Sequence, residues 1–241
     1  MKNQGTIREL LAEFIGSMFL LTVVNGVAIM FSSHLDGDSM NVILTSAIAV
    51  PAILFVIIEL FGPISGAHFN PVVTMVMFFE KQITAIKSIQ YILAQLLGGI
   101  VGIMVSHLMF YHESDGLLFI SEVARPDFNY FSEGIGTFML VFAVLALTKT
   151  KSDKATFVIP LLVGGNILAT SSTMFANPQV TLARMFTNSV AGVRPVDGLA
   201  FIAMQVIGAI LAYIVYKLLF KRRTEDIQGT SLDGSVKKII H

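Results

Sequence analysis

The sequence contains no cysteine, and only 13% of its 241 residues are charged. Without cysteine the chain can form neither a disulfide framework nor a thiol-based active site. The 16 basic and 16 acidic residues give a formal net charge of zero, which indicates no basic surface for nucleic acid. The motifs contain no nucleophile–base pair and no cluster of metal-ligating residues. We therefore expect no enzyme activity, no cofactor, no metal site and no nucleic-acid partner.

Apolar residues, in contrast, make up 54% of the chain, and the mean hydropathy is +0.77. This composition is typical of a polytopic membrane protein. The first apolar run, residues 10–31, is too long for the core of a signal peptide and is predicted to be a spanning helix. Six segments are long enough to span a membrane: residues 8–31, 40–61, 84–110, 129–148, 155–173 and 197–220.

Two polar stretches interrupt this pattern, and each contains an Asn-Pro pair: Asn70-Pro71 and Asn177-Pro178. Asparagine is a strong helix N-cap, and proline is pre-set for the first helical position. The first pair leads into an apolar run that ends at Phe79. A run of about ten residues is roughly 15 Å long, which is half of a hydrocarbon core. We therefore expect two half-helices that together cross the membrane once.

The same arrangement occurs twice in the chain. Three spans and one Asn-Pro segment lie within residues 8–110 and again within residues 129–220. Because each half has three spans, the second half is inverted relative to the first. Short broken helices at corresponding positions of inverted repeats indicate a site at the membrane midplane. We expect one channel domain over residues 1–223 and a flexible cytoplasmic tail over residues 224–241.

The distribution of basic residues predicts the orientation. Apart from Arg125, Arg184 and Arg194, every Lys and Arg lies in a terminal segment or in a loop on the same side as the termini. Positive charge in short loops gathers on the cytoplasmic side of a membrane. We therefore expect a multi-pass protein of the cell membrane, with both termini in the cytoplasm and the loop 111–128 outside.

The interrupted segments also predict a lumen. Non-helical backbone at membrane depth is tolerated only where it is buried in protein or lines water. If the side-chain oxygen of Asn70 caps its own helix, its NH2 group is free to donate into a lumen, and Asn177 would do the same from the opposite side. The positive ends of the half-helices would disfavour cations, protons included. Carbonyl acceptors would come from the preceding loops, at Gly66, Ala67, His68, Thr173, Met174 and Phe175.

On these motifs the chain resembles the aquaporin family, the major intrinsic proteins. The resemblance covers about residues 8–220 and rests on the paired Asn-Pro boxes, the lead-in from Ser65 to Pro71, the paired Glu-x-x-Gly motifs and the inverted repeat. It implies an all-α membrane fold of six tilted helices and two re-entrant half-helices. It also implies a homotetramer in membrane lipid, with one pore per subunit, and passive conduction in both directions.

The boxes themselves depart from the family pattern. They end in Val72 and Gln179, where the family usually has alanine, and these bulkier residues could narrow or close a pore. Val180 stands where many members have a pore arginine. The pattern is most similar to that of bacterial members which lack this arginine, some of which pass metalloid hydroxides. The similarity points to a bacterial inner membrane.

The other positions of the constriction can be aligned by their distance from the boxes. They fall at Val50, at Met174 and at either Gly165 or Asn166. With Val180 these residues supply no planar cation, no aromatic wall and no imidazole. We expect a pore that is wider and less polar than a water-only filter. Water, glycerol, urea or undissociated metalloid hydroxides are the predicted solutes.

Four charged residues in or near the spans have alternative interpretations. Glu13 and Glu133 are expected to accept backbone N–H bonds from the re-entrant loops, and the alternative is a proton relay. Arg184 lies one helical turn beyond Val180, where it could act as a displaced filter cation at the outer mouth or bind external carbonyls or lipid headgroups. Glu59 is either a pore-lining acid or a structural partner.

Three classes of function are compatible with the sequence. The leading prediction is a facilitative channel for water and small uncharged solutes. The second is a secondary transporter of inverted-repeat design, although the two boxes contain no charged site for a coupling ion. The third is a structural membrane protein with a vestigial pore.

Overall fold

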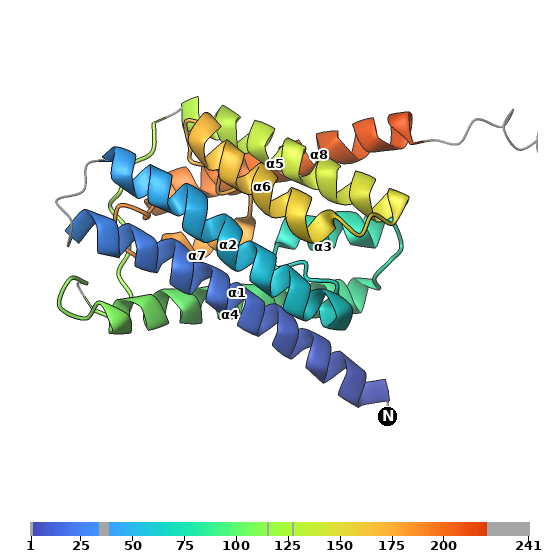
Figure 1. The fold of residues 1–241 in the computed structure, drawn as a ribbon, viewed down its shortest axis with the longest axis horizontal. Helices are drawn as coiled ribbons and strands as arrows, with labels where there is room; N and C mark the ends of the chain where they lie inside the picture. Colours follow the sequence, from blue (N-terminus) through green and yellow to red (C-terminus); the bar gives the residue numbers. More distant parts are fainter. Residues whose placement is uncertain (1, 34–38, 115, 127, 221–241) are drawn as a thin grey trace, which may run out of the picture.

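The computed structural model of the chain describes residues 2–33, 39–114, 116–126 and 128–220 (Figure 1). The predicted tail, residues 224–241, lies outside the described residues. Within them the chain forms eight helices and no strand. The helices are α1 (Lys2–Ser33), α2 (Ser39–Ser65), α3 (Pro71–Phe79), α4 (Ala85–Met109), α5 (Phe128–Thr150), α6 (Ala155–Ala169), α7 (Pro178–Arg184) and α8 (Pro195–Leu219).

Among the described residues, five helices are long and apolar enough to cross a membrane, namely α1, α2, α4, α5 and α8. The apolar helix α6 has 15 residues, which corresponds to about 22 Å. It ends at Ala169, although the sequence predicted a span to residue 173, because the chain turns at Thr170 into the loop that leads to Asn177. The predicted fold class, an all-α membrane protein with six transmembrane helices and two re-entrant half-helices, is confirmed.

The two halves of the chain use the same helix contacts. Helix α1 packs on α4, and α5 packs on α8, through glycines at the crossings. A Cβ on Gly98 would overlap the carbonyl oxygen of Phe14, and a Cβ on Gly208 would overlap that of Gly134. The backbones can therefore approach this closely only without side chains at these positions. The halves join through α2 and α6, where a Cβ on Gly164 would lie 2.7 Å from Cγ of Pro51.

The half-helices α3 and α7 lie between the long helices and start near the middle of the bundle (Figure 1). The side-chain oxygen of Asn70 accepts a hydrogen bond from the backbone N–H of Val72 at 3.1 Å. The side-chain oxygen of Asn177 likewise accepts from the backbone N–H of Gln179 at 3.0 Å. Both helices begin at the proline that follows the cap, as the sequence predicted.

The outer surface differs from that of a water-soluble protein. Large apolar side chains face outward around the bundle, and Ile48, Ile86 and Leu218 are each more than 70% exposed. Acidic side chains lie inside, since Glu13 and Glu133 have no exposed surface. This distribution suits a chain whose outer surface contacts hydrocarbon.

Candidate functional site

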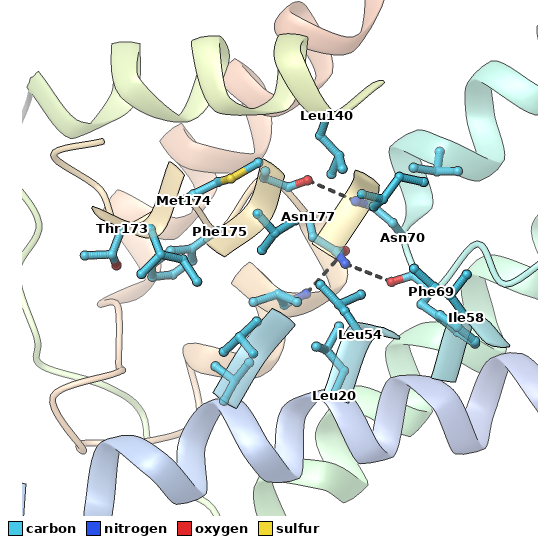
Figure 2. Close-up of a pocket in the computed structure, with 18 of the residues that line it drawn as sticks. Leu20, Leu54, Ile58, Phe69, Asn70, Leu140, Thr173, Met174, Phe175 and Asn177 are labelled. Carbon is cyan, nitrogen blue, oxygen red and sulfur yellow. Dashed lines mark hydrogen bonds between the residues drawn. The ribbon is translucent and has the colours of Figure 1, made fainter. Parts of the chain in front are cut away.

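A cavity of about 520 Å³ follows the length of the bundle and is lined by both halves of the chain. Thr148 in the last turn of α5 lines one end, and Arg125, which precedes α5, lines the other. The walls are mainly aliphatic, with Leu20 of α1, Leu54 of α2 and Leu140 of α5 around the centre (Figure 2). The polar lining comes mostly from the loops before the half-helices, at Gly66, Ala67, His68, Phe69, Asn70, Thr173, Met174, Phe175, Ala176 and Asn177.

At the centre of the cavity, the two Asn-Pro boxes bind each other. The Nδ2 of Asn70 donates to the carbonyl oxygen of Ala176 at 2.9 Å, and the Nδ2 of Asn177 donates to that of Phe69 at 2.8 Å (Figure 2). The prediction that each NH2 group is wholly free is therefore wrong. The carbonyls of the opposing loop need a donor at this depth, and the asparagines supply it. Each NH2 group carries a second hydrogen, which has no other partner among the described residues.

A buried carboxylate holds each loop in place. Glu13 accepts from the backbone N–H groups of His68 and Phe69 at 3.0 and 2.8 Å. Glu133 accepts from those of Phe175 and Ala176, both at 2.8 Å. Both carboxylates therefore use their two oxygens for main-chain donors, which is the arrangement expected of loop supports rather than of a proton relay.

A glutamine and a threonine join each of these networks, and the Oγ of Ser65 also donates to Glu13 at 2.6 Å. The Nε2 of Gln95 donates to Glu13 at 2.7 Å and to Thr74 at 3.0 Å. In the other half, the Nε2 of Gln205 donates to Glu133 at 2.7 Å and to Thr181 at 2.8 Å. The threonines lie in the half-helices and the glutamines in α4 and α8. Each half-helix is thereby tied to a long helix of its own half.

These supports hold a strained backbone. The loops contain non-glycine residues in the left-handed region, with φ of 51° at Ala67, 45° at Phe69, 60° at Thr173, 48° at Met174 and 47° at Ala176. Such a conformation costs an L-residue roughly 1–2 kcal/mol. The strain lies only one to four residues from the caps, so the site has the backbone outliers that commonly accompany function.

The predicted constriction is only partly assembled from the residues that the sequence indicated. Val50, Met174 and Val180 line the cavity. Gly165 does not: a Cβ built on it would meet only open space, and the residue is exposed. Asn166 does not line the cavity either, because its Nδ2 donates to Leu162 of its own helix at 2.9 Å.

Helix α6 instead turns a different face to the cavity. Ile159, Val163 and Ile167 line it, and their spacing of four residues is that of one helical face. The alignment by distance from the box assumed a loop of fixed length. Because α6 already ends at Ala169, the last residue of this helix that lines the cavity is Ile167, an aliphatic side chain that the sequence reasoning missed.

The bulky residues that end the boxes point away from the cavity. Val72 is buried in an apolar cluster that also contains Val141 and Ala209. Gln179 lies against Gly99 of α4, where a Cβ would overlap its Nε2. Neither residue lines the cavity, so the expectation that they could narrow or close it is wrong. The sequence position next to the cap is not enough to place a side chain, because successive residues of a half-helix face different directions.

Of the two other titratable residues considered in the sequence, His68 lines the cavity and Glu59 does not. His68 lines the cavity, where its Nδ1 lies 3.0 Å from the Oγ1 of Thr74 and its ring packs edge-on to Tyr91 at 5.3 Å. Glu59 does not line the cavity and its side chain is exposed, so the interpretation as a pore-lining acid is wrong.

Arg184 lines the same end of the cavity as Arg125, with only 7% of its surface exposed. Its Nε donates to the carbonyl oxygen of Ala191, and its guanidinium carbon lies 3.4 Å from the centre of the Phe175 ring. Arg125 lies over the same ring at 5.5 Å, on the loop between α4 and α5. Sequence reasoning missed Arg125. The available signal was that Arg125 is one of the three basic residues on the acidic side of the chain.

The sequence and the fold are similar to those of known proteins. The family model of the major intrinsic proteins matches residues 1–176. An aquaglyceroporin named AqpS from Rhizobium meliloti is 34% identical over 231 residues, which cover 96% of this chain and 98% of that protein. Aquaporin-1 from Bos taurus is 30% identical over 91% of this chain and 84% of its own length. The crystal structure of an aquaglyceroporin from Plasmodium falciparum superposes with a TM-score of 0.64 at 20% identity, over 88% of this chain and 95% of that one.

Proposed function

The chain belongs to the major intrinsic protein family, and from this premise we propose that it is a passive channel for water and small uncharged solutes. The solutes that fit are glycerol, urea and undissociated metalloid hydroxides. They would pass in single file between the caps Asn70 and Asn177. The observation that carries this proposal is the pairing of the two caps across one cavity, with a hydrogen of each amide left for a solute.

The lining of the cavity supports solutes of this kind. Amide donors and loop carbonyls lie on one side, and aliphatic side chains such as Leu54 and Leu140 form the rest of the wall. A solute that combines hydroxyl groups with an apolar skeleton can satisfy both surfaces. An ion would lose its water shell without an equal replacement, which is costly in such an environment. The positive ends of α3 and α7 add a further barrier to cations.

We assign the selectivity constriction to Val50, Met174, Val180 and Ile167, with Arg184 at the rim beside it. Three of the four apolar side chains are branched aliphatic, and Met174 is flexible. Arg184 stands one turn beyond the position where many family members carry a pore arginine. Because the guanidinium of Arg184 lies over Phe175 and bonds to Ala191, it occupies the rim and leaves the level of Val180 apolar. This supports a constriction that admits glycerol and urea.

The two alternative functions have less support. A secondary transporter needs a charged site for its coupling ion near the midplane. Among the described residues that line the cavity there is no Asp, Glu or Lys. A vestigial pore was suggested by Val72 and Gln179, and both face away from the cavity.

The proposed channel also has a location in the membrane and an oligomeric state. The chain is a multi-pass membrane protein with apolar helices. We propose that both termini face the cytoplasm of a bacterial inner membrane, on the distribution of Lys and Arg. We also propose a homotetramer with one pore in each subunit, since the exposed apolar helix faces could contact further copies as well as lipid. We propose that residues 1–223 of each subunit form the channel domain.

The experiment is a measurement of permeability in proteoliposomes. Stopped-flow light scattering would give the rates for water, glycerol and urea, with and without a collapsed proton gradient. The Asn70→Leu and Asn177→Leu variants should each lower these rates, because each loses a donor in the lumen, the bond to the opposing loop and a cap worth about 1 kcal/mol. Asn166→Leu is the matched control, because Asn166 lies outside the cavity lining.

Three results would contradict the proposal. Rates that depend on the proton gradient would indicate a transporter. Rates no higher than those of protein-free vesicles would indicate a vestigial pore. A double Asn70→Leu, Asn177→Leu variant that keeps its helical content and conducts like the wild type would exclude the caps as the conducting site.

A further inference from the structure

Charge is confined to one end of the cavity. Within the described part of its lining, the only charged side chains are Arg125 and Arg184. They come from segments far apart in the sequence, the loop after α4 and the last residue of α7. Both stack on the same ring, that of Phe175, at 5.5 and 3.4 Å. Two like charges have thus been brought to one rim, which is costly unless something compensates them.

Arg184 is compensated only in part. Its Nε bonds to the carbonyl of Ala191, and the face of its guanidinium lies on Phe175. In the described structure its Nη1 and Nη2 make no hydrogen bond, and it has no ion-pair partner. The guanidinium is a planar fork of five donors. Four of these donors, those on the two Nη atoms, remain for a ligand in the cavity.

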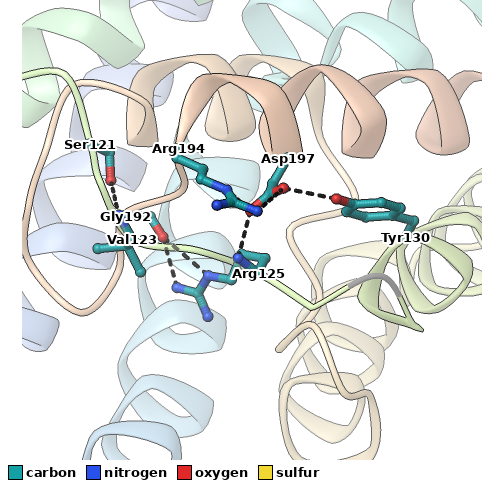
Figure 3. A network of polar contacts seen from close by, with 7 residues as sticks. All are labelled: Ser121, Val123, Arg125, Tyr130, Gly192, Arg194 and Asp197. Carbon is teal, nitrogen blue, oxygen red and sulfur yellow. Dashed lines mark hydrogen bonds and ion pairs between the residues drawn. The ribbon is translucent and has the colours of Figure 1, made fainter.

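Arg125 is anchored by main-chain carbonyls rather than by a carboxylate. Its Nη2 donates to Val190 at 2.8 Å. Nη2 and Nε also donate to Gly192, at 2.9 and 3.1 Å (Figure 3). Its Nη1 makes no hydrogen bond within the residues described. The side chain is therefore fixed in place while one end of its fork stays available.

The nearest carboxylates are already committed. Asp197 accepts from the backbone N–H of Arg125, from Tyr130 and from Arg194, whose Nε lies 2.7 Å away (Figure 3). Glu133 accepts from the loop amides and Gln205. Neither forms an ion pair with Arg125 or Arg184. The rim therefore carries two arginines whose remaining donors have no hydrogen-bond acceptor among the described residues.

We propose that Arg125 and Arg184 form a binding site for a small carboxylate at the outer rim of the pore. A carboxylate matches the guanidinium fork through two parallel N–H···O bonds, and such charge-assisted bonds are stronger than neutral ones. The donors that match it are Nη1 and Nη2 of Arg184 and Nη1 of Arg125. The proposal rests on the proposed channel function in one respect: a carboxylate held here obstructs the passage of neutral solutes.

The structure also indicates why the bound anion stops at the rim. Beside the arginines the lining includes the aliphatic side chains of Val180, Val50 and Ile167. To move further, a carboxylate would exchange its guanidinium partners for aliphatic side chains, and a charge is not stable there without partners. The site is therefore a place of capture, and the ligand acts as a blocker rather than as a permeant.

Sodium formate is the probe, because formate is the smallest carboxylate. The first measurement is the unfolding temperature of the detergent-solubilised protein by differential scanning calorimetry, in sodium formate and in sodium chloride at equal ionic strength. Ligand that binds only the folded protein raises this temperature. The second is the glycerol rate in proteoliposomes, with formate at equal concentration on both sides. We expect formate to raise the unfolding temperature more than chloride does, and to lower the glycerol rate in a saturable manner.

The Arg125→Gln and Arg184→Gln variants should each need about ten times more formate to give the same shift in unfolding temperature and the same fall in glycerol rate. A tenfold loss of affinity is usual when a hydrogen bond to a charged group is removed. Arg194→Gln is the matched control, since Arg194 lies outside the cavity lining and is already ion-paired with Asp197. If Arg184→Gln does not fold, Arg125→Gln decides alone, because its backbone bond to Asp197 is unchanged.

Equal effects of formate and chloride in the wild type, or formate effects that persist in Arg125→Gln, would overturn the site. A formate current across the membrane would overturn the blocking role. A wild-type protein that binds formate through these arginines but conducts neither glycerol nor urea would support the site and contradict the proposed channel function.

Discussion

Replacing Glu133 by glutamine tests whether the carboxylate holds the loop that leads to Asn177. Glu133 accepts three hydrogen bonds, from the backbone N–H groups of Phe175 and Ala176 and from Gln205. Glutamine has one acceptor oxygen and an NH2 group where the second oxygen was. One N–H of the loop would therefore face another donor. The remaining bonds would lose their charge assistance, which makes the total loss roughly 3–6 kcal/mol.

This loss can be compared with the strain that the bonds hold. Thr173, Met174 and Ala176 are in the left-handed region, at roughly 1–2 kcal/mol each, so the loop stores roughly 3–6 kcal/mol. The two quantities are of the same size. We therefore expect the loop to relax in Glu133→Gln while the helices remain, and the glycerol and water rates to fall by tenfold or more.

Glu13→Gln should have the smaller effect of the two. The loop that Glu13 supports has two strained non-glycine residues, Ala67 and Phe69, and its third left-handed position is Gly66, which adopts that conformation without cost. The assay is stopped-flow permeability beside circular dichroism at 222 nm. Glu59→Gln is the control, because its side chain is exposed and outside the cavity lining. If Glu133→Gln conducts like the wild type, the carboxylate is not what holds the loop.

Three further predictions concern the constriction and the packing. Val180→Arg should lower glycerol and urea rates more than the water rate in the same stopped-flow assay, because it places a planar cation at the narrow level; a uniform fall in all three would contradict this. Gly208→Ala should destabilise the folded protein by about 1–3 kcal/mol, since its Cβ would overlap a backbone carbonyl that cannot yield. Calorimetry against Gly62→Ala, where the Cβ meets open space, checks it. Gln179→Met should raise stability by about 1–3 kcal/mol, because the amide of Gln179 is buried with no partner among the described residues, and an unchanged or lower unfolding temperature would show that the amide is satisfied.

The features that the sequence predicted well are those with a local physical cause. An Asn-Pro pair before an apolar run determines both where a helix starts and which side chain caps it, and α3 and α7 begin where the pattern indicated. Gly98 and Gly208 also act locally, because a Cβ at either position would overlap backbone at a helix crossing. Long apolar runs likewise predicted the spanning helices, because their length must match the hydrocarbon core.

The errors have a common origin in geometry that is not local. The end of α6 at Ala169 determines which face of that helix meets the cavity, and no residue near Gly165 signals where the helix ends. The direction of Gln179 depends on the space left by Gly99, a residue eighty positions earlier in another helix. Arg125 lies in a loop without regular structure, and its place beside Phe175 follows from carbonyls of the segment before α8. Such contacts join elements that sequence spacing alone does not connect.

The internal symmetry separates what builds the site from what the solute meets. The two loops are supported alike: glutamate, glutamine and threonine occur in both halves, with bonds to equivalent atoms. The side chains at the first supported position of each loop differ, because His68 in the first half corresponds to Phe175 in the second. His68 binds Thr74 of its own half-helix, and Phe175 carries the two arginines. The hydrogen bonds that support the loops are the same in both halves, but the side chains at His68 and Phe175 differ. The loop supports can therefore be kept while the residues at either end of the cavity change independently. Exchanging these two residues should therefore alter which solutes and anions enter from each side, and leave the paired caps between them intact.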